Sequence, residues 1–325
     1  MNEKQDFSAA TRLAVTDITP PRKFTDPELT AAGERRASVP PRHLETLWIN
    51  TGSLCNLACE RCYLESTPTN DRLSYISLAE VERLLDEIAQ EHFGTREIGF
   101  TGGEPFLNPD MLPILTLCLE RGFAVLVLTN AMSTMYRERD ALLALHRAHG
   151  ARLKLRVSLD HYEAEKHAEE RGPRSWKPAI RGLRWLSENG LSFSVAGRTF
   201  WNEGEGGMRR GYATMFAAND IALDAANPGD LILFPEMDET ADVPEITTAC
   251  WGILNKDPAD IMCATSRMVV KHKGDDHLSV MACTLLPYDQ RFNLGRTLAE
   301  AWRPIQLNHP HCAKFCVLGG GSCSQ

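Results

Sequence analysis

Cys55, Cys59 and Cys62 lie close together in the chain, with the spacing C-x3-C-x2-C. The apolar run at residues 47–49 predicts a buried strand, so the thiols lie on the loop that leaves it. Three thiolates on one loop can bind a compact iron–sulfur cube, whose irons are normally held by four cysteines. Such a loop leaves one iron with an open coordination position, and open positions are where metal sites do chemistry.

A structural zinc site, or a set of buried free thiols, is the alternative interpretation of these cysteines. Zinc sites usually contain paired C-x2-C segments and four ligands that close the coordination sphere. The triplet has one C-x2-C spacing and supplies three ligands, so the sequence favours an iron–sulfur cluster.

At these residues the sequence resembles the radical S-adenosylmethionine (SAM) superfamily, whose fingerprint is C-x3-C-x-aromatic-C on the loop after the first barrel strand. Arg61 stands at the aromatic position here, and Tyr63 follows the last cysteine. The resemblance implies that the three cysteines hold a [4Fe-4S] cluster that passes one electron to bound SAM. Methionine and a 5′-deoxyadenosyl radical are then released, and the radical takes a hydrogen from the substrate. An electron donor such as flavodoxin or ferredoxin is implied as a partner.

Composition limits the other classes of function. The chain has 325 residues, of which 43% are hydrophobic and 24% charged, as in an ordinary globular protein. Its net charge of -8 offers no basic excess for phosphates, which argues against a general nucleic-acid binder. The first residues lack an apolar signal-peptide core, and no apolar run reaches membrane-spanning length. Ten cysteines without an export signal indicate metal binding in a reducing compartment, so we expect a cytoplasmic protein without membrane contact.

The sequence divides into three parts. Residues 1–43 contain prolines among charged residues and predict an extended N-terminal arm. Residues 44–240 alternate between strand-like and helix-like stretches, which predicts a parallel α/β sheet. With the SAM fingerprint, the resemblance implies the superfamily's partial (β/α)6 TIM-like barrel. Residues 241–325 lose this alternation and predict a small C-terminal domain with a β-hairpin and a helix.

Local signals place the elements of the alternating part. Ser77 and Glu80 form a capping box before a helix that runs to residue 88. Asn108 and Pro109 predict the start of the next helix, as N-cap and first-turn proline. Strands are expected at residues 47–49, 98–100, 124–128, 153–159, 191–195 and 231–234, and further helices at 137–149, 176–186 and 208–218.

Polar residues stand where these predicted strands end. In parallel barrels, functional residues gather at the carboxyl ends of the strands, so the polar residues are expected to lie near one another. The set comprises Gly102, Gly103, Glu104, Asn130, Ser158, Asp160, Arg198, Glu236 and Asp238.

Residues 102–105 read Gly-Gly-Glu-Pro and match the superfamily's GGEP motif. Glycines let the backbone approach a ligand closely, and a carboxylate suits an ammonium group. The resemblance implies that Gly102, Gly103 and Glu104 bind the amino group of SAM. Ser158 resembles the superfamily's serine near the ribose or the methionine end of SAM.

For five of the candidate site residues, the sequence is compatible with a functional role and with a purely structural one. Arg171 and Arg198 are candidates for the methionine carboxylate of SAM, with a solvated surface arginine as the alternative. Asn130 suits a polar strand end that faces the cofactor, or an ordinary turn. Glu236 and Asp238 are candidates for substrate contact or proton transfer, or for a helix-capping or surface role.

A second set of cysteines lies in the C-terminal part, at Cys263, Cys283, Cys312, Cys316 and Cys323. Residues 267–273 and 277–282 predict a hairpin between the first two, and a short helix through residue 302 precedes the others. This order resembles the twitch or SPASM domains, and the resemblance implies one auxiliary [4Fe-4S] cluster.

The ligands of that cluster are not fixed by the sequence. We favour Cys263, Cys283, Cys312 and Cys316, with Cys323 as an alternative. A structural zinc site, or an iron left open to bind substrate, competes with a closed cluster. Two other cysteines are set aside: Cys118 lies on an apolar helix face and is expected in the core, and Cys250 is expected to be a bystander.

Two classes of function follow. The favoured one is a radical SAM enzyme that acts on a small molecule, because no peptide-recognition domain is evident. Maturation of a ribosomally made peptide is the alternative within this class. The other class is a non-catalytic iron–sulfur or zinc scaffold, which leaves the polar strand ends unexplained.

Overall fold

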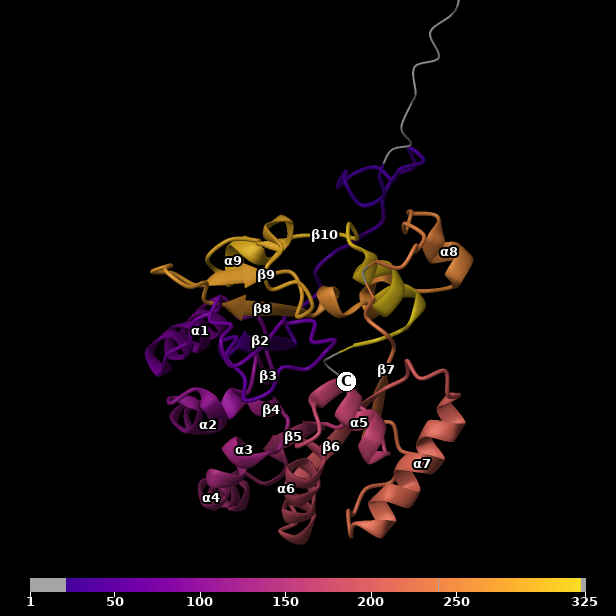
Figure 1. Cartoon of the computed structure of the whole chain (residues 1–325). Helices are drawn as coiled ribbons and strands as arrows, with labels where there is room; N and C mark the ends of the chain where they lie inside the picture. Colours follow the sequence, from indigo (N-terminus) through magenta and orange to yellow (C-terminus); the bar gives the residue numbers. More distant parts are fainter. Residues whose placement is uncertain (1–21, 239, 323–325) are drawn as a thin grey trace, which may run out of the picture.

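The computed structural model of the chain describes residues 22–238 and 240–322. About half of the predicted N-terminal arm (residues 1–21) and Cys323 lie outside the described residues. A twisted sheet passes through the molecule, and helices follow one another around its outer side (Figure 1). The C-terminal part continues the sheet beyond β2 (Thr46–Asn50) and contains β8 (Ser266–Val270), β9 (Ser279–Met281) and α9 (Leu298–Ala301) (Figure 1).

Strands β2 to β7 form the predicted parallel sheet. Each pairs in parallel with the next along the chain, and the sheet continues as β7-β6-β5-β4-β3-β2-β8-β9. The predicted α/β class is therefore confirmed. The strands span Thr46–Asn50 (β2), Glu97–Thr101 (β3), Ala124–Thr129 (β4), Leu153–Ser158 (β5), Ser192–Arg198 (β6) and Leu231–Phe234 (β7).

The helix between β2 and β3 begins as predicted. Ser77 accepts a hydrogen bond from the backbone of Glu80, and the Glu80 side chain accepts one from the backbone of Ser77. The helices span Leu78–Gln90 (α1), Met111–Glu120 (α2), Ser133–Arg137 (α3), Arg139–His149 (α4), Ala164–Arg171 (α5), Trp176–Glu188 (α6), Glu205–Ala218 (α7), Cys250–Leu254 (α8) and Leu298–Ala301 (α9).

The predicted start of α2 at Asn108 and Pro109 is wrong by two residues. The N-cap is Asp110, and Asn108 instead ends the short 3-10 helix η1 (Pro105–Leu107). The Asn108 side chain also makes a long-range contact, in which its Nδ2 donates to the carbonyl oxygen of Ile76 at 2.8 Å. Its Oδ1 also accepts a hydrogen bond from the backbone N–H of Asp110 at 2.9 Å, so Asn108 keeps a local contact just before the helix begins.

The predicted C-terminal hairpin is present as β8 (Ser266–Val270) and β9 (Ser279–Met281), which pair antiparallel. The sequence did not predict where this hairpin lies. Strand β8 pairs in parallel with β2, with Thr46 opposite Ser266, so the C-terminal part extends the main sheet. Residues that follow the barrel are thereby held close to the cysteine loop.

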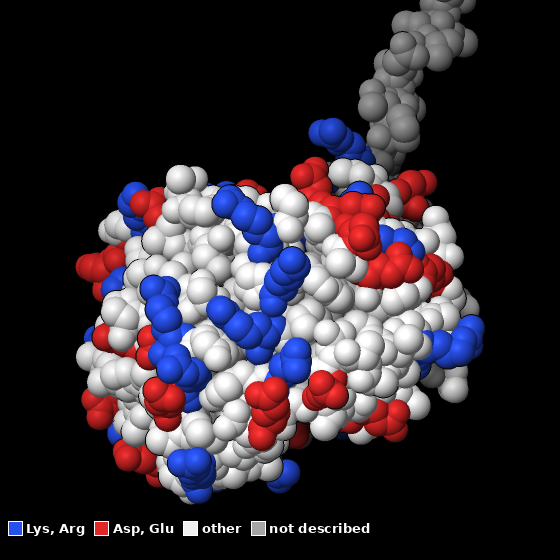
Figure 2. Space-filling view, turned by 60° about the horizontal axis from the view of Figure 1, so that its bottom comes forward, with Lys and Arg blue, Asp and Glu red and all other residues white. Residues whose placement is uncertain are grey.

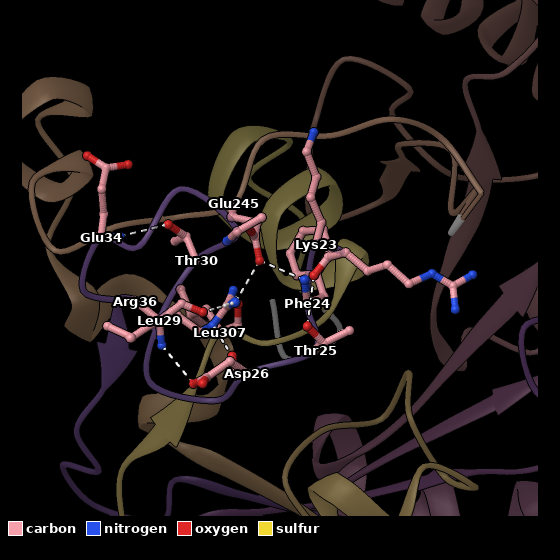
Figure 3. Close-up of polar contacts among 12 residues, drawn as sticks. Lys23, Phe24, Thr25, Asp26, Leu29, Thr30, Glu34, Arg36, Glu245 and Leu307 are labelled. Atoms are coloured by element: carbon pink, nitrogen blue, oxygen red, sulfur yellow. Dashed lines mark hydrogen bonds and ion pairs between the residues drawn. The ribbon is translucent and has the colours of Figure 1, made fainter. Parts of the chain in front are cut away.

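The described part of the N-terminal arm packs against the C-terminal part. Strand β1 (Ser38–Val39) pairs antiparallel with β10 (Ile305–Gln306). Beside it, the buried Arg36 forms an ion pair with Glu245, whose Nη2–Oε1 distance is 2.6 Å (Figure 3). The same carboxylate accepts hydrogen bonds from the backbone of Phe24 and Ala31, both at 2.6 Å. Three residues of the N-terminal arm are therefore held by one carboxylate of the C-terminal part.

The surface carries charged residues of both signs. On the face in Figure 2, Lys and Arg side chains are interspersed with Asp and Glu, which gather beside the start of the described chain. No helix in residues 22–238 or 240–322 is long and apolar enough to cross a membrane.

Arg36→Met should destabilise the protein strongly, because it leaves Glu245 buried without its cation. Breaking a buried pair in this way costs about 3–5 kcal/mol. The free energy of unfolding, from urea titration, measures this cost. Lys23→Met is the matched control, since Lys23 pairs with Asp242 at 2.5 Å in an exposed position and should lose less than about 1 kcal/mol. Equal losses in both variants would contradict the role of the Arg36–Glu245 pair.

Candidate active site

A cavity of about 150 Å³, the inner cavity, lies at the carboxyl ends of the parallel strands. It brings together residues from the loops after β2, β3 and β4 with residues from β5, α5 and β6. The predicted site residues that line it are Cys55, Cys59, Cys62, Gly102, Gly103, Asn130, Ser158, Asp160, Arg171 and Arg198. The structure therefore gathers most of the predicted set around the cysteine loop.

The cysteine loop packs directly on the Gly-Gly-Glu segment. The backbone N–H of Gly103 donates to the carbonyl oxygen of Gly52 at 2.8 Å, and that of Glu104 donates to Leu54 at 3.1 Å. A Cβ atom at position 103 would lie 2.0 Å from the carbonyl oxygen of Leu54. Only glycine permits this approach, so the motif sets the position of the loop.

Two thiols of the loop, Cys55 and Cys59, are poor acids in this setting. Burial, with a smaller contribution from the charges of Glu104, Cys59 and Cys62, raises the pKa of Cys55 to about 12. Burial also raises the pKa of Cys59, against a lowering by Arg171. Thiolates here need a bound cation, and soft thiolate donors suit an iron–sulfur cluster. The three thiols share one cavity, so the donor set fits the cluster that the sequence implies.

Glu104 lies beside the inner cavity and is not among its lining residues. Its buried carboxylate accepts hydrogen bonds from the Thr129 hydroxyl at 2.7 Å and from the Asn130 backbone N–H at 2.9 Å. Burial raises its pKa to about 7, against the lowering by these bonds. The Asn130 side chain in turn donates to Asn56 at 2.8 Å. Glu104 thus holds the end of β4 against the cysteine loop.

Helix α5 holds the other side of the loop through Glu170. The carbonyl oxygen of Glu170 accepts a hydrogen bond from the backbone N–H of Glu60 at 2.9 Å. Its buried carboxylate pairs with Arg61 and with Arg198, the latter at 3.2 Å. Both guanidinium groups lie over the ring of Phe200, at 4.5 and 4.9 Å. Arg61, at the position where the fingerprint has an aromatic residue, therefore contacts an aromatic ring from elsewhere in the chain.

Sequence reasoning missed Glu170 and Phe200. A single acidic residue in a charged helix and a phenylalanine after a strand carry no motif. Their roles come from contacts with Arg61, which is more than a hundred residues away.

Arg171 is engaged by Asp160. Its Nε and Nη2 donate to the two carboxylate oxygens at 2.6 and 3.2 Å. Burial opposes the charge of Asp160, but Arg171 and then Arg198 outweigh it and hold the pKa of that carboxyl below its usual value. The predicted cofactor arginine therefore also has a structural partner.

Glu236 and Asp238 line a second cavity of about 810 Å³, the outer cavity. Lys314 lies 3.5 Å from the Glu236 carboxylate, and Asp238 accepts a hydrogen bond from the Thr240 hydroxyl at 2.6 Å. The two cavities share Arg61, Cys62, Tyr63, Arg198, Met237 and Leu285. The outer cavity thus gives access to the cysteine loop from the surface.

The C-terminal cysteines also converge. Cys263, Cys283, Cys312 and Cys316 line one small apolar cavity, together with His311. Burial raises the pKa of Cys312, and the neighbouring Cys283 and Cys263 raise it further. These positions come from η4 (Met262–Ala264), the segment after β9 and the π-helix η6 (Cys312–Leu318). The favoured ligand set is therefore brought together, and Cys323 lies outside the described residues.

The two cysteines that were set aside lie elsewhere. Cys118 is fully buried on α2, as predicted. The Cys250 sulfur accepts a hydrogen bond from the backbone of Thr247 at 3.4 Å, and Cys250 does not line the C-terminal cavity. Within the described ranges, no three His, Cys, Asp or Glu side chains are placed to hold one metal ion. Cysteines that hold a cube each bind a different iron, which requires a wider spacing.

Gly103→Ala should displace the cysteine loop, because its Cβ would overlap the Leu54 carbonyl oxygen. Overpacking of this kind costs about 1–3 kcal/mol. Iron bound after anaerobic reconstitution should fall. Gly207→Ala is the control, since a Cβ there meets nothing within 4 Å. Full iron content in Gly103→Ala would show that the loop tolerates the displacement.

Known proteins are similar to this chain in sequence over part of its length. Residues 49–200 match the sequence model of the radical SAM superfamily. The chain is 32% identical over 147 residues to the antilisterial bacteriocin subtilosin biosynthesis protein AlbA of Bacillus subtilis (45% of this chain, 31% of AlbA). It is 30% identical over 141 residues to GTP 3′,8-cyclase of Rhodococcus opacus (42% of this chain, 38% of the cyclase). The matches thus span about a third of each relative's length.

Among solved structures, Streptococcus suis SuiB bound to S-adenosylmethionine is similar in fold. The TM-score is 0.57 at 15% identity, over 82% of this chain and 66% of SuiB. Another SuiB structure contains the precursor peptide SuiA. The sequence match covers the cysteine loop, the Gly-Gly-Glu segment and the strand ends of the inner cavity. Residues 49–200 of the chain are therefore similar in sequence to the radical SAM superfamily.

Proposed function

We propose that the chain is a radical SAM enzyme that modifies a peptide, with the reaction centred on the inner cavity. The observation that carries this proposal is the convergence of Cys55, Cys59 and Cys62 with the Gly-Gly-Glu segment and the polar strand ends. A [4Fe-4S] cluster on these cysteines would supply one electron for cleavage of SAM to methionine and a 5′-deoxyadenosyl radical. In the cell, a flavodoxin or ferredoxin would deliver that electron in the cytoplasm.

The chain's own residues position SAM. Gly102 and Gly103 keep the backbone close to the cysteine loop, where the amino group of SAM would bind beside Glu104. Ser158, at the end of β5, faces the same cavity and is proposed for the ribose or methionine end. Arg198 is the favoured partner of the methionine carboxylate. Arg171 holds the Asp160 carboxylate with two nitrogens, whereas Arg198 contacts Glu170 through Nη1 and its buried Nε has no hydrogen-bond partner among the described residues.

The substrate is proposed to enter through the outer cavity. Its lining includes both charged and aromatic side chains, among them Glu236, Asp238 and Tyr288. A mixed lining of this kind suits a peptide segment, which presents amides and side chains together. A bacteriocin-biosynthesis relative and the SuiB structure with its precursor peptide support this choice. Glu236 and Asp238 would contact the substrate or transfer a proton at the mouth.

A small-molecule substrate is the second candidate. The size of the outer cavity, about 810 Å³, lies within the range of small-molecule sites. The similarity to GTP 3′,8-cyclase supports it. Untargeted comparison of metabolites and of small peptides from wild-type and deletion strains would separate the two candidates.

We also propose an auxiliary [4Fe-4S] cluster on Cys263, Cys283, Cys312 and Cys316. These cysteines share a cavity that adjoins the outer cavity, since Leu285, Leu286 and His311 line both. A cluster there would lie next to the substrate. It would also tie the C-terminal part together, because metal binding and folding are coupled where no preformed site exists.

The central test is reductive cleavage of SAM. Protein purified without oxygen and reduced with dithionite should produce 5′-deoxyadenosine, measured by liquid chromatography and mass spectrometry. Replacing Cys55, Cys59 and Cys62 together by Ala should abolish the product, because no cluster can form there. Cys118→Ala is the control, since that thiol lies in the core far along α2. Equal product from the triple variant would sink the assignment.

Iron content tests the auxiliary cluster. Reconstituted wild-type protein should hold about eight irons per chain, as two cubes. The triple variant should keep about half, with a [4Fe-4S] signal in its Mössbauer spectrum. Replacing Cys312 and Cys316 should lose the other half and expose the C-terminal part to proteolysis. A triple variant with one zinc and no iron would show a zinc site instead.

A further inference from the structure

A pair of opposite charges lies buried against the cysteine loop. Asp160 follows β5, and Arg171 is the last residue of α5. Their side chains are 5% and 16% exposed, and two hydrogen bonds of 2.6 and 3.2 Å join them. This two-point contact fixes the guanidinium plane, so the pair is a dipole of fixed direction.

The guanidinium end of this dipole faces the thiols. Arg171 lines the inner cavity with Cys59 and Cys62, and it interacts electrostatically with both sulfur atoms. On the pKa of the Cys59 thiol, the lowering by Arg171 exceeds the raising by Asp160. At the Cys59 sulfur, the positive end of the pair therefore outweighs the negative end.

Backbone contacts prevent the pair from turning away. The carbonyl oxygen of Asp160 accepts a hydrogen bond from the backbone of Arg198 at 3.0 Å. The residue before Arg171, Glu170, accepts one from the backbone of Glu60, between Cys59 and Cys62. Helix α5 is thus joined directly to the backbone of the cysteine loop.

The other titratable side chains near the cysteine loop are either paired with an opposite charge, neutral, or placed on its far side. Glu170 is shared by Arg61 and Arg198, and Arg61 is half exposed, so water screens it. His167, one turn before Arg171 on α5, is fully buried, and burial lowers its pKa to about 4. It therefore carries no charge at neutral pH. Glu104 acts on Cys55, on the far side of the loop.

We infer that Asp160 and Arg171 set the reduction potential of the cluster at Cys55, Cys59 and Cys62, with Arg171 raising the potential and Asp160 lowering it. This inference rests on the proposed function. Reduction adds one electron, and so one negative charge, to a cluster that three thiolates already make anionic. A nearby fixed cation stabilises the reduced form more than the oxidised form, and burial keeps this interaction strong. Neither residue exchanges a proton in this step.

An anaerobic redox titration tests the inference. Dithionite supplies the electron, and the readout is the electron paramagnetic resonance signal that changes when SAM is added. Arg171→Gln should shift the midpoint potential to a more negative value. Asp160→Asn should shift it to a more positive value, because the guanidinium left behind stays charged. Opposite shifts from two changes at one contact cannot come from a general loosening of the site.

Two further variants complete the design. Arg171→Lys keeps the positive charge and should stay near the wild-type potential. Arg121→Gln, at the exposed end of α2, should cause no shift. If Arg171→Gln fails to take up iron, Asp160→Asn still tests the sign. Unchanged potentials, or shifts in one direction, in variants that retain the signal would overturn the inference. A wild-type protein that neither shows the signal nor cleaves SAM would instead contradict the proposed function.

Discussion

The contact between two backbone segments supports the whole site. Gly103 and Glu104 donate to the carbonyl oxygens of Gly52 and Leu54, which places the start of the cysteine loop against the end of β3. The parallel register of β2 with β3 brings these segments to one level, with Asn50 opposite Thr101. Because the approach leaves no room for a Cβ at position 103, the glycine is a steric requirement and not a source of flexibility.

Electrostatics then constrains what the cavity can hold. Burial raises the pKa of the Cys55 and Cys59 thiols, so a bound multivalent cation is needed to keep these two sulfurs ionised. Arg171 and Arg198 add positive charge, and buried carboxylates at Asp160 and Glu170 keep them in place. Removing one member of either pair would leave a buried charge without a partner, at a cost of several kcal/mol. Two buried ion pairs, Asp160–Arg171 and Glu170–Arg198, therefore fix the positions of the charged side chains in the site.

The sequence predicts local features well and long-range pairing poorly. The capping box at Ser77 and the hairpin of β8 and β9 were both predicted, because their signals lie within a few residues. The parallel pairing of β8 with β2 was not predicted, because the sequence of an apolar strand does not indicate which strand it pairs with. The Gly-Gly-Glu motif identified a site residue in Glu104, but its contacts with Thr129 and Asn130 required the structure. Glu170 had no signal at all.

The most direct measurement of the central claim is electron-nuclear double resonance on the reduced protein with SAM labelled at its amino nitrogen with ¹⁵N. If Cys55, Cys59 and Cys62 leave one iron open and SAM binds that iron, the reduced cluster should show a ¹⁵N coupling. The coupling should be absent when these cysteines are replaced, and it should persist when Cys312 and Cys316 are replaced. A reduced cluster whose spectrum does not change with SAM, and that shows no ¹⁵N coupling, would contradict the account.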